Sequence, residues 1–236
     1  MTPVLLSPIP NVARAPASAR QQPVEAQVGL LRLSPPRAKR IADIVIASAL
    51  LLLALPLGVL IALLILLESG RPVFFGQMRI GRGGRRFRLW KFRSMTLDGD
   101  DVLREHLERR PERAVEWLHF HKLKDDPRVT RVGRFLRKRS LDELPQLWNV
   151  LRGDMSMVGP RPIVDDEVQK YSRVFPLYTR VLPGLTGLWQ VSGRTETSYR
   201  RRVELDTAYI RTWTLRLDLQ ILLRTVRVVL NGHGAY

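Results

Sequence analysis

Cysteine is absent from the 236-residue chain. Its absence excludes disulfide bonds, zinc sites built on thiolates and catalysis by a cysteine nucleophile. Histidine is scarce, with four residues, and only His119 and His121 lie close together in sequence. No other ligand type accompanies that pair, so a solvated pair is favoured over a metal site.

Acidic residues are also fewer than basic ones. The 39 Lys and Arg residues outnumber the 22 Asp and Glu residues, and the formal net charge is +17. A chain with this balance is expected to have anionic partners, and nucleic acid, anionic lipid and phosphorylated small molecules are the candidates. The length suffices for one domain with a sizeable core plus appendages.

The first 38 residues lack any hydrophobic period. Residues 1–38 hold seven of the sixteen prolines, and this composition predicts a disordered N-terminal tail. The opening VLLSPIP is too short and too interrupted by proline to serve as the apolar region of a signal peptide.

Residues 44–67 form a run of 24 residues without a single charge. As a helix this run would be about 36 Å long, more than the roughly 30 Å of a bilayer's hydrocarbon core. We therefore predict a membrane helix within residues 39–70, kinked or broken at Pro56. Basic residues flank both of its ends, and such flanks tend to stay cytoplasmic. A kinked transmembrane helix and a re-entrant helix with both ends on one side both remain open.

The remainder, residues 71–236, reads as mainly helical with one small sheet. Apolar runs at residues 73–75 and 87–92 flank several glycines, which predicts a β-hairpin. Residues 98–124 are expected to be helical after a turn at DGDD. Residues 209–230 have helical periodicity with Arg on the opposite face, typical of a helix that packs on a core or lies in a membrane interface. The predicted fold is therefore mainly α with a small β-hairpin (α+β).

An acidic pair, Asp142 and Glu143, stands in a basic stretch. Residues 122–161 contain ten Lys or Arg and five Asp or Glu. Ser140 and Glu143 have the spacing of a helix-capping box, although Pro145 fits better if the helix starts at Asp142. Basic neighbours and the helix dipole favour an ionised Asp142. Such a carboxylate suits a nucleophile or a magnesium ligand, and capping remains the alternative.

Four segments together resemble the bacterial sugar transferase family, the monotopic polyprenyl-phosphate phosphoglycosyl transferases. They are KRIADIVIASALLLLALPLGVLIALLILLESGRPVFFGQMRIG, FRLWKFRSM, RSLDELPQLWNVLRGDMSMVGPRP, and PGLTGLWQVSGR followed by ELDTAYI. The resemblance covers about residues 38–236. The chain's ending is most similar to the short galactosyl- and glucosyl-1-phosphate transferases that initiate exopolysaccharide synthesis.

The resemblance implies a reaction. A sugar-1-phosphate passes from a UDP-sugar to undecaprenyl phosphate with release of UMP, through a covalent phosphosugar-aspartyl intermediate, with Mg²⁺ as cofactor. By the same resemblance Asp142 is the nucleophile and a metal ligand, Glu143 is its partner and Arg161 contacts phosphate. Pro56 would break a re-entrant helix, so that a catalytic domain lies on the cytoplasmic face of the bacterial inner membrane.

Several residues are candidates for the substrate's phosphates. They are Lys91, Arg93, Arg161 and Arg194, with Asp206 as a further site residue or a helix cap. The chain departs from the family's pattern at two positions. Leu55 precedes Pro56, where members often have Ser, and Leu182 precedes PGLTG, where many members have Arg or Lys.

The expected partners are a UDP-sugar, undecaprenyl phosphate and membrane lipid, without nucleic acid, and homo-oligomerisation stays open. Galactose and glucose are the leading candidates for the sugar. The rival interpretations are a membrane-anchored basic protein that binds anionic lipid or nucleic acid, and an ordinary glycosyltransferase, which would release UDP.

Overall fold

A computed structural model describes residues 37–110, 112–114, 117, 123, 125–193 and 198–231, with side chains up to residue 229 in the last range. The long helices are α2 (Arg37–Ser69), α3 (Gly99–Arg109), α9 (Tyr199–Thr212) and α10 (Leu215–Asn231). The shorter ones are α5 (Arg131–Lys138), α6 (Gln146–Arg152), α7 (Val168–Tyr171) and α8 (Phe175–Tyr178). Four short 3₁₀ segments join them, among them η2 (Leu141–Glu143). The described residues are thus mainly helical, as predicted.

The predicted hairpin is confirmed. Strands β1 (Phe74–Ile80) and β2 (Arg86–Phe92) pair antiparallel, with Phe75 opposite Lys91 and Arg79 opposite Phe87. The turn between them uses Gly83 and Gly84 with positive φ, a conformation that glycine adopts without steric cost.

A second, two-stranded sheet brings two of the quoted motifs together. Strands β3 (Ser156–Val158) and β4 (Gly184–Thr186) pair in parallel. Gly159 follows β3 and lies so close to Gly184 that a Cβ atom added to Gly184 would fall 2.1 Å from the Gly159 nitrogen. Only glycine fits this crossing, which joins GPRP to PGLTG.

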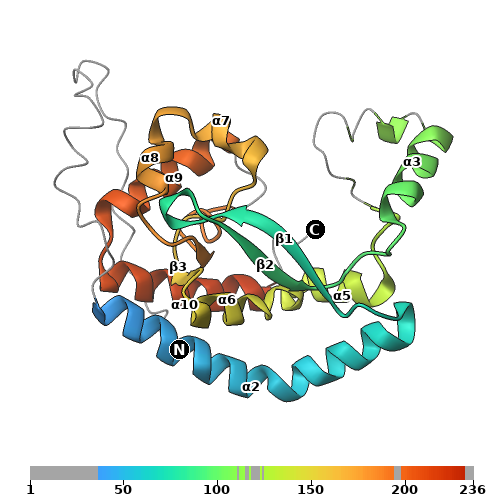
Figure 1. Ribbon diagram of the computed structural model, residues 1–236, viewed down its shortest axis with the longest axis horizontal. Helices are drawn as coiled ribbons and strands as arrows, with labels where there is room; N and C mark the ends of the chain where they lie inside the picture. Colours follow the sequence, from blue (N-terminus) through green and yellow to red (C-terminus); the bar gives the residue numbers. More distant parts are fainter. Residues whose placement is uncertain are drawn as a thin grey trace, which may run out of the picture. The chain divides into compact units, whose positions relative to one another are not determined.

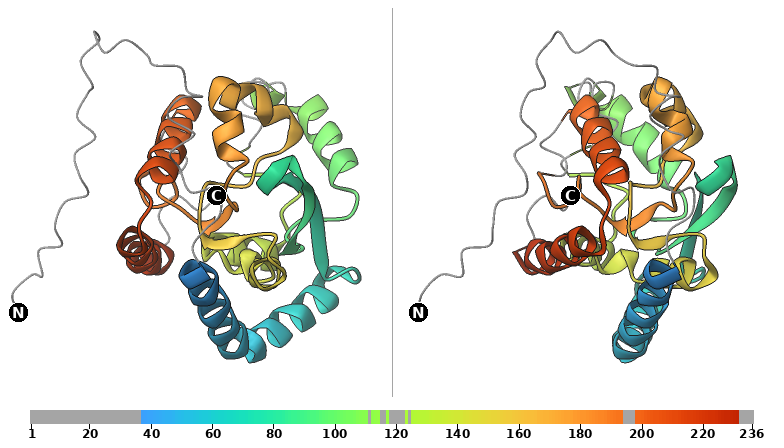
Figure 2. Two further views of the ribbon diagram at one scale, coloured as in Figure 1. Left: turned by 60° about the vertical axis from the view of Figure 1, so that its left-hand side comes forward. Right: turned by 90° about the vertical axis from the view of Figure 1, so that its left-hand side faces the viewer.

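Helix α2 runs without interruption across Pro56. Figures 1 and 2 show that it bends near its middle and lies along the edge of the body formed by α5, α6 and α10. The expected break at Pro56 is therefore a bend inside a continuous helix. A proline inside a helix removes one backbone hydrogen bond and tilts the axis, and the remaining bonds keep the turns in register.

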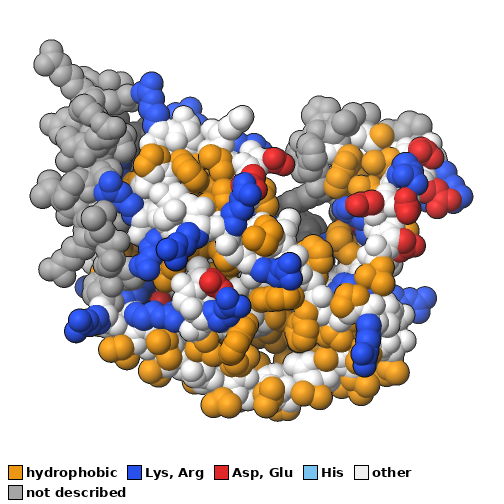
Figure 3. Space-filling view, viewed as in Figure 1, with side chains coloured by type: hydrophobic (Ala, Val, Ile, Leu, Met, Phe, Trp, Pro, Cys, Tyr) orange, Lys and Arg blue, Asp and Glu red, His pale blue; other side chains and the backbone are white. Residues whose placement is uncertain are grey.

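Most of the apolar surface of α2 faces away from the protein. The helix is long and apolar enough to cross a membrane by length and composition, yet Leu52 is 73 % exposed and Leu53 is 78 % exposed. Figure 3 shows hydrophobic side chains along the lower edge, where α2 runs, with Lys and Arg side chains gathered above it. An exposed apolar face along a whole helix marks a surface that a membrane or another protein covers.

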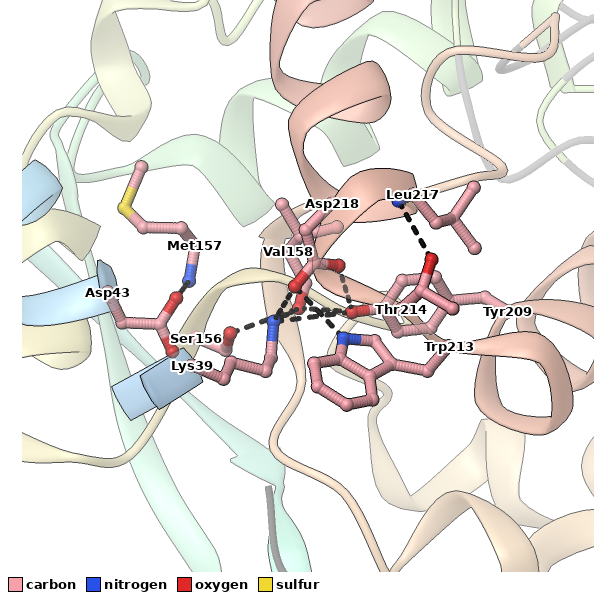
Figure 4. A network of polar contacts seen from close by, with 10 residues as sticks. All are labelled: Lys39, Asp43, Ser156, Met157, Val158, Tyr209, Trp213, Thr214, Leu217 and Asp218. Atoms are coloured by element: carbon pink, nitrogen blue, oxygen red, sulfur yellow. Dashed lines mark hydrogen bonds and ion pairs between the residues drawn. The ribbon is translucent and has the colours of Figure 1, made fainter. Parts of the chain in front are cut away.

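The N-terminal end of α2 is bonded to the folded body. Lys39 Nζ donates to Asp218 Oδ2 of α10 at 2.6 Å and to the Val158 carbonyl at 3.0 Å (Figure 4). Arg40 donates to the carbonyls of Val150 and Leu151 at 2.7 and 2.8 Å. These carbonyls end α6, where a cation complements the helix dipole.

The C-terminal end of α2 is bonded to the same body. Arg93 is buried and its guanidinium contacts the carbonyls of Ser69 and Gly70 at 2.8 and 2.7 Å, with Arg71 O at 3.4 Å. Glu68 in turn accepts from the backbone nitrogen of Arg131 at 2.8 Å. The last carbonyls of α2 and the first backbone N–H group of α5 thereby obtain partners, which the helices themselves do not supply.

The predicted single helix over residues 209–230 is wrong in one respect, because the chain divides it into α9 and α10. Trp213 adopts extended backbone angles (φ −52°, ψ 131°). Thr214 then caps α10, since its hydroxyl accepts from Leu217 N at 3.0 Å. Threonine at this position satisfies an otherwise unpaired amide. The apolar stripe on α10 is real, and Leu219, Leu223 and Val226 are all exposed.

Replacing Arg93 with Ala should destabilise the fold. The change leaves the partly buried carbonyls at the end of α2 without the Arg93 guanidinium, which costs about 2 kcal/mol and should lower the melting temperature by roughly 4–8 °C. Thermal unfolding in detergent micelles measures it. Arg134→Ala, at an exposed position on α5, is the matched control. Equal melting temperatures for the two variants would contradict the capping role.

Candidate active site

The acidic pair lies in the 3₁₀ turn η2, between α5 and α6. Ser140 enters this turn in the left-handed region with φ 54°. Its side chain makes no capping bond, so the capping-box interpretation is wrong. Pro145 stands immediately before α6, where its missing N–H leaves no helical bond unmade.

Two leucines hold the turn in place. Leu141 and Leu144 flank the acidic pair and pack against an apolar cluster that contains Ile61 and Ile65 of α2 and Leu136 of α5. The same cluster contains Phe92, which follows Lys91 on β2. One apolar cluster therefore positions both the acidic pair and the strand that carries Lys91.

Lys91 bridges the two carboxylates. Its Nζ lies 2.7 Å from Glu143 Oε1 and 3.5 Å from Asp142 Oδ2. Lys91 and Glu143 are about a quarter and a third exposed, whereas the Asp142 side chain is 10 % exposed. The arrangement presents one buried carboxylate, one partly exposed carboxylate and one cation at the surface of the hairpin.

Burial raises the pKa of Asp142 above its ordinary value, and the charge of Glu143 acts in the same direction. Lys91 and Arg137 lower that pKa. The basic neighbours lower the pKa of Asp142 as predicted, but the loss of solvent around the carboxylate raises that pKa by more. Asp142 is therefore a stronger base than a solvated aspartate, and a stronger base is also the better nucleophile once it is ionised.

Asn149 fastens α6 to β2, and nothing in the sequence pattern singled it out. Its side-chain oxygen accepts from Trp90 N at 3.1 Å and its Nδ2 donates to the Arg88 carbonyl at 2.8 Å. A buried amide thus replaces a neighbouring strand along the free edge of β2. Because Trp90 precedes Lys91, this contact sets the position of Lys91 relative to the turn that leads into α6.

Arg161 and Asp206 lie in a second cluster. The Arg161 guanidinium carbon is 5.6 Å from the centre of the Trp189 ring. Asp206 is 1 % exposed and accepts a 2.6 Å hydrogen bond from the Tyr171 hydroxyl. Burial raises the pKa of Asp206 to about 6. Asp206 therefore supports this cluster from within the core.

Two further residues complete the second cluster. Arg202 is buried between the Tyr199 and Trp189 rings, 4.9 and 5.2 Å from their centres, and bonds Glu167 at 2.9 Å. Arg79 of β1 lies 3.8 Å from the same Glu167. These residues come from distant segments, so a single sequence carries no signal that groups them.

The hairpin connects the two clusters. Arg79 stands opposite Phe87, and Phe87 and Lys91 lie on one face of β2 because side chains two apart along a strand share a face. Cross-strand partners also share a face. Lys91 and Arg79 are therefore on the same side of the hairpin, four residues or about 13 Å apart along it.

The structure thus brings Lys91, Asp142 and Glu143 together, and it groups Arg161 with Asp206 elsewhere along the hairpin. Arg93 lies at the end of α2, where its guanidinium contacts backbone carbonyls. Arg194 lies outside the described residues. Among those described, no group of three or more His, Cys, Asp or Glu side chains could hold a metal ion.

Comparison with known proteins adds a family match. The model of the family described as bacterial sugar transferase matches residues 35–232. An undecaprenyl-phosphate galactose phosphotransferase of Salmonella typhimurium is 49 % identical over 198 residues, covering 84 % of this chain and 41 % of that protein.

Two further relatives are matched over more of their own length. The exopolysaccharide production protein ExoY of Rhizobium meliloti is 47 % identical over 213 residues, covering 90 % of this chain and 94 % of ExoY. A UDP-glucose:undecaprenyl-phosphate glucose-1-phosphate transferase of Caulobacter vibrioides is 46 % identical over 208 residues, covering 84 % and 72 %. The chain therefore spans less than half of one relative and nearly all of another.

Replacing Asn149 with Ala should displace Lys91 from the acidic pair. A shift of about 1 Å at a reacting group can lower turnover roughly 100-fold, so we expect a large fall in kcat with little change in KM. Steady-state kinetics measure both, and Gln169→Ala, an exposed amide on α7, is the control. Wild-type kcat in Asn149→Ala would contradict the positioning role.

Proposed function

The chain belongs to the bacterial sugar transferase family, and from this premise we propose that it transfers a hexose-1-phosphate from a UDP-sugar to undecaprenyl phosphate. The observation that carries the proposal is the buried Asp142, beside Glu143 and bridged to it by Lys91. Two relatives whose names describe this reaction, one with galactose and one with glucose, are 49 % and 46 % identical to the chain. We assign the reaction to the first step of exopolysaccharide repeat-unit assembly.

Asp142 acts as the nucleophile. A carboxylate oxygen of Asp142 forms a bond to the sugar-bearing phosphorus of the UDP-sugar, and the bond from that phosphorus to the bridging oxygen breaks, so UMP leaves with the bond's electron pair. An oxygen of undecaprenyl phosphate then attacks the same phosphorus and displaces Asp142 as its carboxylate. Two displacements of this kind divide one difficult step into two easier ones.

The surrounding charges suit attack by an anion on an anionic substrate. Lys91 lies within 3.5 Å of Asp142 and offsets the repulsion between the carboxylate and the substrate's phosphates. Arg161, which lies partly exposed beside Trp189, is our candidate for a second phosphate contact.

Asp142 and Glu143 fit a magnesium ion as a pair. Mg²⁺ is commonly held by one or two carboxylates together with substrate phosphates and water, and these two side chains converge on Lys91 Nζ. Magnesium supplies neutralisation of phosphate charge. We propose Asp142 and Glu143 as its protein ligands.

The contacts at the two ends of α2 support a re-entrant arrangement. Lys39 and Arg40 at one end, and Ser69 at the other, bond to the same folded body, while the exposed apolar side chains lie between them. A helix that crosses a bilayer places its ends about 30 Å apart on opposite sides. We propose that α2 enters and leaves one leaflet, with the bend at Pro56 as its deepest point.

The net charge and the apolar stripe of α10 support a position of the folded domain at the cytoplasmic face of the inner membrane. The net charge of +17 favours anionic lipid headgroups and the positive-inside orientation. The exposed stripe of Leu219, Leu223 and Val226 on α10 suits a helix that lies in the interface. The transferred sugar is galactose or glucose, as the relatives' names divide between the two.

Replacing Asp142 with Asn should abolish UMP release. The amide cannot act as the nucleophile, so we expect turnover to fall by about three orders of magnitude or more. Membranes that contain the protein receive UDP-galactose or UDP-glucose, Mg²⁺ and undecaprenyl phosphate, and the released nucleotide is identified by chromatography. Asp165→Asn, an exposed residue paired with Arg86, is the control. Release of UDP, or full activity in Asp142→Asn, would refute the proposal.

Replacing Lys91 with Met should shift the pH profile. Lys91 lowers the pKa of Asp142, so its removal raises that pKa further. Because only the carboxylate attacks phosphorus, activity falls as pH drops through this pKa, and the acid limb of kcat/KM should move to higher pH. Lys91→Arg keeps the charge and should retain the wild-type limb. An acid limb that stays in place or moves to lower pH in Lys91→Met would contradict this account.

A further inference from the structure

A cavity of about 150 Å³ lies between α2 and α10, above β3. Each helix contributes four residues at spacings of three, four and seven, which places them on one face of the helix. The walls are Lys39, Ala42, Asp43 and Ile46 from α2, Met157 and Val158 from β3, and Leu215, Asp218, Leu219 and Leu222 from α10.

The charged groups in the walls are bonded to protein partners. Lys39 Nζ is occupied by Asp218 and the Val158 carbonyl, and Trp213 Nε1 donates to Asp218 Oδ2 at 2.9 Å (Figure 4). Asp43 Oδ1 accepts from Met157 N at 3.0 Å. Because these polar atoms already have partners, the cavity presents mainly aliphatic carbon and suits an apolar ligand.

The cavity is continuous with the exposed apolar surface. Leu215 and Leu219, which line it, are 47 % and 58 % exposed, and the α2 residues Ile44 and Val45 beside it are exposed as well. An engineered cavity of about 150 Å³ with apolar walls binds benzene. The space therefore accommodates a segment of about six carbons, and the saturated polar groups leave no anchor for a headgroup.

We propose that this cavity holds one acyl chain of a membrane phospholipid. The inference rests on the proposed membrane position of α2, which brings the cavity's rim into contact with lipid. A bound chain would fill the space between the two helices and shield the Lys39–Asp218 pair from water. The lipid would thus complete the packing of α2 against α10.

The headgroup of the polyprenyl acceptor does not lie in this cavity, because its phosphate must reach Asp142. The turn that carries Asp142 packs against the cluster that contains Ile61 and Ile65, whereas the cavity lies at residues Lys39 to Ile46. Fifteen residues separate Ile46 from Ile61, or about 22 Å along the helix. The acceptor's phosphate and the cavity therefore occupy separate places along α2, and the polyprenyl probe described below tests whether the acceptor's long chain enters the cavity.

Photolabelling tests the proposal with the full chain in vesicles of phosphatidylglycerol and phosphatidylethanolamine. One set of vesicles contains a phospholipid with a diazirine near the end of its acyl chain, and a second set contains a diazirine-bearing polyprenyl phosphate. Mass spectrometry maps the labelled residues. We expect the phospholipid probe to label Met157 and Leu222, which line the cavity, and this map needs no variant.

Two matched variants sharpen the test. Ala42→Phe fills the cavity, whereas Ala49→Phe adds the same ring at an exposed position of α2. Labelling of Met157 and Leu222 should be lost in the first variant and kept in the second. The proposal is overturned by equal labelling in both variants, by labelling with the polyprenyl probe alone, or by none inside the cavity. If the phospholipid probe labels neither the cavity residues nor Leu52 and Leu53, the result would refute the membrane position of α2.

Discussion

The attachment of both ends of α2 to one folded body is the constraint on which the rest of the structure depends. At one end the buried Lys39–Asp218 pair joins α2 to α10, and at the other Arg93 binds the last carbonyls of α2. Removing one partner of a buried ion pair costs about 3–5 kcal/mol. These contacts therefore prevent either end of the apolar helix from separating from the domain.

This constraint also determines where the acidic pair lies. The second half of α2 contributes Ile61 and Ile65 to the cluster that receives Leu141 and Leu144 from either side of the acidic pair. Phe92 of the same cluster stands between Lys91 and Arg93 in sequence. The helix that carries the exposed apolar face thus helps to position Asp142, which we propose as the nucleophile, together with Glu143 and Lys91.

The sequence predicted the features that arise from local patterns. The apolar run, the hairpin around Gly83 and Gly84 and the mainly helical composition follow from periodicity and turn chemistry. Lys91 was expected at the substrate's phosphates, and its ion pairs with Asp142 and Glu143 were not predicted. Arg93 was expected at the phosphates, but its sequence gave no sign that its partners would be the carbonyls of α2.

Other features depend on contacts between distant segments. Asn149 binds the backbone of β2, and Arg202 lies among aromatic rings from three segments, so neither role has a local signature. The break between α9 and α10 combines a threonine cap with the bond from Trp213 to Asp218. The hydrophobic period alone does not predict this break because the apolar positions continue on both sides of it.

Cysteine accessibility tests the central claim most directly, because the native chain contains no cysteine. Single cysteines at Arg37 and Arg71, exposed positions at the two ends of α2, would be reacted with a membrane-impermeant maleimide in spheroplasts and in inverted vesicles. The account predicts that both positions react in inverted vesicles and that neither reacts in intact spheroplasts. Reaction of one end in each preparation would show that α2 crosses the membrane and would contradict the account.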